Sequence, residues 1–160
     1  MNARVDVQLA ADDESVPTAE DMALWVNRTL SAADASSVAE VSVRVVDATE
    51  MRRLNMEFRD QDKATNVLSF PTGDLDGLPA DAQLPLGDIV VCAAVVADEA
   101  EQQGKPVGEH WAHMIVHGTL HLLGFDHEND SDAADMEGLE IQILADHGIA
   151  NPYRESPAEN

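Results

Sequence analysis

The stretch His117-Gly-Thr-Leu-His-Leu-Leu-Gly-Phe-Asp-His127 predicts the end of a long helix, a tight turn and a cluster of histidines. His117 and His121 are four residues apart, so on a helix they lie on one face with their β-carbons about 5 to 6 Å apart. Gly124 can take the left-handed backbone conformation that ends a helix. The turn that follows directs His127 toward the other two imidazoles. The stretch therefore predicts three histidine side chains that meet at one point.

Three neutral imidazoles at one point are typical of a catalytic zinc site, in which a water molecule takes the fourth position. The histidines and the glycine have the spacing of the metzincin motif H-E-x-x-H-x-x-G-x-x-H. Gly118, however, replaces the glutamate that those proteases use as general base. His110 and His113 precede His117 on the same helical face, and we interpret them as packing residues or as partners of the metal ligands. The sequence thus indicates a zinc centre that lacks a protease base.

The acidic segment 126–137 offers a different cation site. Its acids occupy positions 1, 3, 5 and 12 of a calcium-binding loop, but Ser131 stands at position 6, where such loops have glycine. We therefore interpret Asp130 and Asp132 as the cap and the acidic first turn of a final helix. Asp126 is interpreted as a residue that orients His127.

The remaining sequence predicts a small sheet and several helices. Strand patterns lie near residues 4–9, 41–46, 66–71 and 87–92. Helices are predicted after the capping residues Thr18 and Asp47 and over residues 95–103, 106–123 and 132–147. Strands followed mainly by helices predict an α+β fold, a small mixed β-sheet covered by helices with a metzincin-like metal-binding helix.

Local signals add detail to this fold. Met51, Leu54 and Phe58 share one face of the second helix and are expected to point inward. Pro71 restricts its strand to an edge of the sheet or a strand end. We expect one domain over residues 1–150 and a frayed tail over residues 151–160.

The composition favours a cytoplasmic protein without membrane association. No apolar run approaches the roughly 18 residues of a membrane span. The N-terminal residues MNARVDVQLAADDE lack the apolar core of a signal peptide. Cys92 is the single cysteine, lies in an apolar run and is expected to be a buried thiol.

The charge distribution restricts any contact with nucleic acid to a small area. The formal net charge of −22 opposes a polyanion over most of the surface. Four of the nine basic residues fall within twelve positions and form what we call the basic cluster: Arg52, Arg53, Arg59 and Lys63. The sequence therefore allows one local positive site on an acidic protein. Alternatively, Arg59 is a surface residue that pairs with Asp60 or Asp62.

The sequence resembles the YbeY family of bacterial endoribonucleases and rRNA maturation factors. The stretch 117–127 matches the family motif H-G-x-L-H-L-x-G-[YF]-D-H. Residues 58–71 resemble R-x-x-D-x-x-T-D-V-L-S-F-P, and residues 86–90, Leu-Gly-Asp-Ile-Val, extend the likeness over about residues 40 to 145. Asn66 stands where the family usually has aspartate, and an asparagine can still cap or donate a hydrogen bond.

The resemblance implies a zinc-binding endoribonuclease that hydrolyses single-stranded RNA during 16S rRNA 3′-end maturation and ribosome quality control. The implied partners are single-stranded RNA or a 16S rRNA precursor, a small-subunit ribosomal protein and the GTPase Era. By position, His117, His121 and His127 are the ligands of one Zn²⁺ per chain, and His117 and Arg59 are the catalytic residues. Arg59 and Lys63 are the expected substrate-binding residues.

A phosphodiester suits this set of residues. A metal ion can hold one phosphate oxygen, and the planar guanidinium of Arg59 can bind another. We expect Gly118 to leave space beside the ion. Two alternatives stay open. A zinc hydrolase of peptides or esters would need Asp126 or His113 as base, and a noncatalytic ribosome-assembly factor would use the metal to organise a binding surface.

Overall fold

The computed structural model describes residues 3–11, 13, 15–35, 38–72, 84–125 and 130–152. In these residues the elements follow in the order β1 (Arg4–Leu9), α1 (Ala19–Ala32), β2 (Val38–Val46), α2 (Ala48–Arg59), β3 (Val67–Pro71), β4 (Leu84–Cys92), α3 (Ala93–Gln103), α4 (Val107–Leu122) and α5 (Asp130–Asp146). The four strands form one mixed sheet that helices cover, which confirms the expected α+β fold.

The sheet has the strand order β1-β2-β4-β3. β1 is parallel to β2 and β2 is parallel to β4, whereas β3 is antiparallel to β4 and lies at an edge. Pro71 is the last residue of this edge strand, as its missing N–H donor requires. The side chains of β4 from Ile89 to Cys92 are all buried, because the sheet is covered on both faces around its centre.

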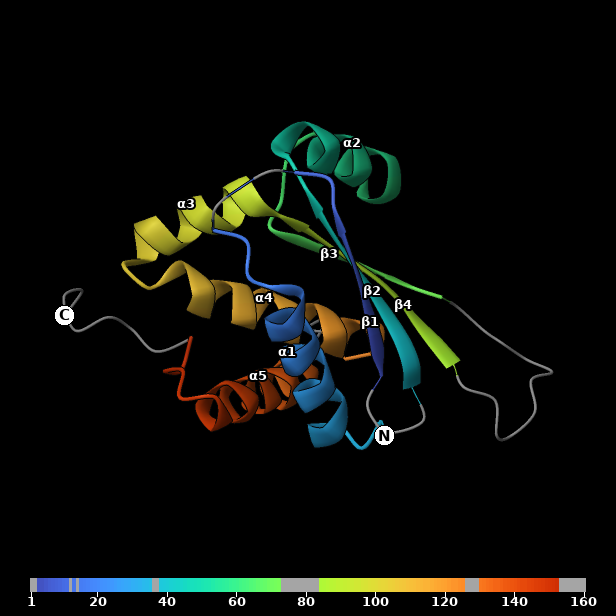
Figure 1. Ribbon diagram of the computed structural model, residues 1–160, viewed down its shortest axis with the longest axis vertical. Coiled ribbons are helices and arrows are strands. Elements are labelled where there is room, and N and C mark those ends of the chain that lie inside the picture. Colours follow the sequence, from blue (N-terminus) through green and yellow to red (C-terminus); the bar gives the residue numbers. More distant parts are fainter. Residues whose placement is uncertain are drawn as a thin grey trace.

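Helices lie on both sides of the sheet. Figure 1 shows α1, α4 and α5 on one side and α2 on the other. Alternate residues of β4 divide accordingly, since Ile89 and Val91 join the larger core and Val90 and Cys92 join the smaller one. Trp111 of α4 is fully buried in the larger core, so α4 is the central helix of its layer.

Local sequence signals fix the helix ends. Thr18 Oγ1 accepts a hydrogen bond from the Asp21 N–H at 3.1 Å, and Asp47 Oδ1 accepts from the Glu50 N–H at 2.8 Å. Both predicted N-caps are thereby confirmed. Gly104 ends α3 with a φ of +65°, and Gly124 follows α4 with a φ of +101°. The turn expected after the histidine helix is therefore present.

Two expectations differ from the structure. β2 begins at Val38, three residues earlier than predicted, because its first residues pair with the early part of β4. Phe58 was expected to point inward, but it is 52% exposed. It lies in the last turn of α2 against Phe70 of the edge strand β3, beyond which no described strand extends the sheet.

Some predictions fall outside the described residues. The tail predicted over residues 151–160 does so from residue 153 onward. The division into a domain over residues 1–150 and a tail over residues 151–160 stays a prediction. Within the described part of the chain, no helix combines the length and the apolar character that crossing a membrane requires.

Candidate metal centre

Four histidines form a row along one face of α4. The ring centroids of His110 and His113 are 6.1 Å apart, as are those of His113 and His117. The rings of His117 and His121 are closest, with a centroid distance of 4.5 Å. This proximity confirms that the helix brings His117 and His121 together, as their four-residue spacing predicts.

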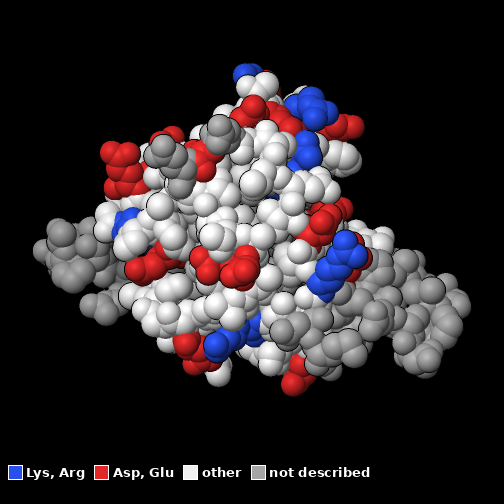
Figure 2. Space-filling model, in the orientation of Figure 1, with Lys and Arg blue, Asp and Glu red and all other residues white. Residues whose placement is uncertain are grey.

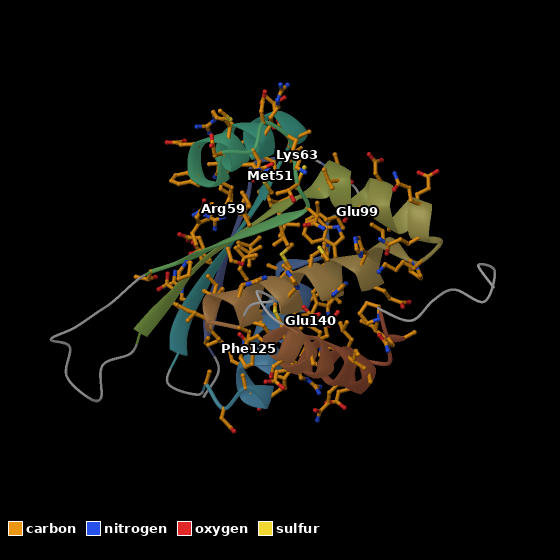
Figure 3. All side chains as sticks on the ribbon, turned by 180° about the vertical axis from the view of Figure 1, so that it is seen from behind. Met51, Arg59, Lys63, Glu99, Phe125 and Glu140 are labelled. Carbon is orange, nitrogen blue, oxygen red and sulfur yellow. The ribbon has the colours of Figure 1, made fainter. Side chains whose placement is uncertain are left out.

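Glu140 of α5 meets this row from the neighbouring helix. Its side chain is 0% exposed, and its Oε1 atom lies 2.5 Å from His117 Nδ1. Its other carboxylate oxygen lies 3.6 Å from His113 Nε2. Figure 3 shows Glu140 where α5 faces α4. A buried carboxylate is stable only when it is paired, so these imidazoles account for its presence inside the protein.

The His117–Glu140 hydrogen bond has a direct meaning for metal binding. When the carboxylate accepts a hydrogen bond from Nδ1–H, the other ring nitrogen of His117, Nε2, has the lone pair that a metal needs. Metal-binding histidines commonly have such a carboxylate partner, which fixes both the tautomer and the ring orientation. The His117 side chain is 18% exposed, so it is not closed off from solvent as Glu140 is.

Two sets of ligands are compatible with this arrangement. His113, His117 and Glu140 can each offer one ligand atom, and these atoms all lie within 4.8 Å of one another. The second set is the predicted one, in which His117 and His121 are joined by His127. His127 and its neighbour Asp126 lie outside the described residues. The two imidazoles and the carboxylate of the first set suit a divalent ion such as zinc, and so do the three imidazoles of the second.

Sequence reasoning missed Glu140, although a signal was present. On α5 the buried residues Met136, Ile143 and Leu144 form an apolar stripe with helical spacing. Glu140 lies within this stripe, four residues from Met136 and four from Leu144. A carboxylate on the inward face of a helix indicates a buried partner, and the nearby histidine row supplies it.

Gly118 has a different role from the one expected. An added β-carbon at this position would lie 2.8 Å from Ile89 Cγ2 and 3.4 Å from both Ser69 Oγ and Val67 Cγ2. Gly118 therefore faces the sheet and allows α4 to pack closely against β3 and β4. The expectation that it leaves space beside the ion is wrong, because the residue after His117 points toward the sheet.

A second carboxylate–histidine pair lies at the other end of the row. His110 Nε2 is 2.9 Å from Glu99 Oε1, and Asn66 Nδ2 donates to the same oxygen at 3.0 Å. Burial lowers the pKa of His110 below its ordinary value, and the hydrogen bond to Glu99 opposes this effect only in part. Asn66 thus serves as a hydrogen-bond donor, which explains how an amide functions at this position.

Arg59 lies at the sheet edge on the α2 side of β3 (Figure 3). Its NH2 group donates to the Ser69 carbonyl at 2.9 Å, and its Cζ atom lies 5.1 Å from the Phe70 ring centroid. Ser69 Oγ in turn donates to the Gly118 carbonyl at 3.0 Å. Two hydrogen bonds therefore connect Arg59 to the residue that follows His117.

The other members of the basic cluster are arranged differently. Arg52 binds Asp62 with distances of 2.7 and 3.1 Å, and this pairing raises the pKa of Arg52 and lowers that of Asp62. Lys63 is held through its backbone carbonyl, which accepts from Asn55 Nδ2 at 2.9 Å. In the described part of the chain, Arg59 has no ion pair with Asp60 or Asp62. The surface-pairing alternative for Arg59 is thereby contradicted.

On the face shown in Figure 2, acidic side chains are scattered among uncharged ones, and several basic side chains lie over α2. The scattered acidic side chains agree with the net charge of −22.

Comparison with known proteins identifies the family of this chain. The family model described as Endoribonuclease YbeY matches residues 7–148. The chain belongs to the YbeY family. An endoribonuclease YbeY from Alcanivorax borkumensis is 49% identical over 156 residues, which is 97% of this chain and 87% of that protein. The matched YbeY segment includes the histidine row, Glu140 and Arg59.

The fold of this YbeY family member is also found in a solved structure. The solution structure of TM1509 from Thermotoga maritima matches with a TM-score of 0.56 at 22% sequence identity. The match covers 98% of this chain and 99% of that one. At this identity the likeness supports the fold alone.

Proposed function

We propose that the protein is a zinc-dependent endoribonuclease that cuts single-stranded RNA. Its proposed place is in the maturation of the 16S rRNA 3′ end and in ribosome quality control. The observation that carries the proposal is the His117–Glu140 pair beside His121, within a chain of the YbeY family. The 49% identity to a relative that is named an endoribonuclease supports RNA as the substrate.

The proposed cofactor is one Zn²⁺ ion per chain, held by His117, His121 and His127. The 4.5 Å distance between the His117 and His121 rings supports this set, because both imidazoles can reach one ion. Zinc supplies a Lewis acid and an acidified water molecule when it is bound. Glu140 holds the His117 ring in place and keeps the proton on Nδ1. Asp126 is proposed to orient His127 in the same manner.

Arg59 is proposed to bind a phosphate of the RNA. Its contacts with the Ser69 carbonyl and the Phe70 ring hold the guanidinium at the sheet edge before substrate arrives. A pre-oriented planar fork can donate two parallel hydrogen bonds to phosphate oxygens. Lys63 is proposed as a further substrate contact. The proposed catalytic residues are therefore Arg59 and His117.

The acidic surface suggests how the protein finds its substrate. Few phosphates can be engaged at a small positive site, so binding to free RNA is weak and has a shallow salt dependence. Single strands are preferred, because a flexible chain can bend a phosphate into a narrow site where a stiff duplex cannot. Stable attachment would come from partners, proposed by family resemblance to be a small-subunit ribosomal protein and the GTPase Era in the cytoplasm.

The test compares the wild type with His117→Ala and Arg59→Lys, all purified side by side. Matched single-stranded and double-stranded RNAs and casein are the substrates. We expect cleavage of single-stranded RNA only, abolished by His117→Ala and strongly reduced by Arg59→Lys, since an ammonium cannot replace the guanidinium fork. RNA cleavage that persists in His117→Ala would indicate a contaminating nuclease and a noncatalytic assembly factor. Cleavage of casein that depends on His117 would favour the peptide hydrolase, although the packing of Gly118 leaves no room for the usual glutamate base.

The two ligand sets are separated by two variants. His121→Ala removes metal if the ion lies among the three predicted histidines, whereas His113→Ala removes it if the ion lies with Glu140. We expect loss of zinc in His121→Ala and retention in His113→Ala, measured by elemental analysis after dialysis.

A further inference from the structure

Phe58 is an exposed aromatic side chain at the edge of the sheet. It lies in the last turn of α2 and is 52% exposed. An exposed phenylalanine costs hydration free energy that a polar residue would avoid, and its ring surface is available to a ligand. The preceding exposed apolar residue on the same helix is Met56, which is 48% exposed but has no ring.

Phe70 of the edge strand fixes the orientation of Phe58. The two ring centroids lie 5.1 Å apart with an interplanar angle of 67°, an edge-to-face arrangement that aromatic pairs favour. The guanidinium of Arg59 lies over the same Phe70 ring in a cation–π contact, with 5.1 Å between Cζ and the ring centroid. One half-buried ring therefore positions an exposed aromatic side chain and an arginine next to each other.

Two hydrogen bonds already described connect Arg59 to the helix of the histidine row. Arg59 binds the carbonyl of Ser69, and the hydroxyl of Ser69 binds the carbonyl of Gly118, the residue after His117. β3 is the edge strand, so no other described strand separates Phe58 and Arg59 from solvent on that side. A polymer bound at the histidines would reach the pair by passing over this open edge, since α2 and α4 lie on opposite sides of the sheet.

We propose that Phe58 and Arg59 form a nucleotide-binding platform, on which one base of single-stranded RNA stacks against Phe58 while the adjoining phosphate binds Arg59. This inference rests on the proposed function and names the site that holds the substrate. Proteins that bind single strands combine basic groups for the backbone with aromatic rings for the bases. A double helix cannot use the platform, because its bases are stacked on one another.

Charge favours RNA over a protein partner as the occupant. Arg59 is bound by backbone carbonyls and has no carboxylate partner among the described residues, so its charge is available to an anion. An apolar protein surface would use Phe58 and Met56 alike, whereas a base stacks on a ring and gains nothing comparable from a thioether. Stacking also tolerates every base, so the platform gives strand selectivity without sequence selectivity.

The test measures the binding of a dye-labelled single-stranded RNA by fluorescence anisotropy. Phe58→Leu keeps an apolar contact with Phe70 but removes the ring, and Phe58→Trp keeps a ring. We expect Phe58→Leu to weaken binding by about 5- to 100-fold, which corresponds to the loss of one base stack. Phe58→Trp should bind at least as tightly as the wild type. Met56→Leu is the matched control and should change binding by less than about twofold, because isosteric exchange there removes no stacking partner.

A series of RNAs with one abasic nucleotide identifies the contact as stacking. In the wild type, one position of the abasic site should weaken binding as much as Phe58→Leu does, and in Phe58→Leu that position should have no further effect. Equal binding of wild type and Phe58→Leu, with weaker binding by Arg59→Ala, would overturn the platform and leave the proposed function intact. Equal weakening by Met56→Leu and Phe58→Leu would point to an apolar docking surface instead. A wild type that neither binds nor cuts RNA would overturn the proposed function and the platform together.

Discussion

The two carboxylate–histidine pairs on α4 have opposite exposure. In the pair at the start of the helix, the His110 side chain is 3% exposed and Glu99 is 31% exposed. In the pair near its end, His117 is 18% exposed and Glu140 is 0% exposed. The first pair closes the imidazole inside the protein, whereas the second buries the carboxylate and turns the imidazole outward. We therefore expect the first pair to serve packing and the second to serve metal binding.

The largest expected difference between the pairs concerns metal content. We expect about one zinc ion per wild-type chain and almost none in His117→Ala. A zinc site loses most of its affinity when one of its three protein ligands is removed. His110→Gln should bind as much zinc as the wild type. Elemental analysis of dialysed protein, with circular dichroism to check folding, measures this difference. Equal losses in both variants would remove the distinction between the pairs.

A smaller effect is expected from the carboxylates. Glu140→Ala should lower zinc affinity by about 10- to 100-fold, because His117 loses the partner that orients its ring. Glu99→Ala should leave zinc affinity nearly unchanged. Competition with a chelator measures both, and Glu140→Gln, which keeps an acceptor, should fall between Glu140→Ala and the wild type. Complete loss of zinc in both Glu140 variants would mean that Glu140 is itself a ligand.

The smallest effect concerns acid stability and the buried member of the first pair. Burial lowers the pKa of His110, so at pH values below about 6.5 the unfolded chain binds a proton there that the folded chain does not. The free energy of unfolding should therefore fall as pH drops through that range, by at most about 1.4 kcal/mol per pH unit from His110. Above about pH 7 His110 is neutral in both the folded and the unfolded chain, so this loss of stability is absent.

Urea unfolding of wild type and His110→Gln between about pH 7.5 and pH 5 tests this expectation. The variant should lose less stability on acidification, since glutamine does not titrate. Parallel pH dependence in the two proteins would show that His110 is protonated as readily in the folded state as in the unfolded chain.

Local chemistry made much of the fold predictable. Thr18 and Asp47 are side-chain caps whose partners lie three residues away, and Gly104 and Gly124 satisfy backbone conformations that other residues avoid. Each of these signals acts over a few residues. The proximity of His117 and His121 followed from helical spacing for the same reason.

Contacts between distant segments could not be predicted in this way. Glu140 is 23 residues from His117, and their meeting depends on how α5 packs on α4. The strand order, with β4 inserted between β2 and β3, depends on pairings that no local pattern encodes. Phe58 has correct helical spacing for burial but lies beyond the edge of the sheet, so its exposure follows from topology.

The close packing of Gly118 limits which side chains this fold can accept at residue 118. A β-carbon at residue 118 would lie 2.8 Å from Ile89, so any larger side chain requires α4 to move away from β3 and β4. Such a movement would also shift His117 and His121 relative to the sheet edge. A single codon change therefore cannot introduce a glutamate base at this position while the rest of the protein stays in place. A glutamate at residue 118 would therefore need compensating changes at Ile89 and in the neighbouring edge strand.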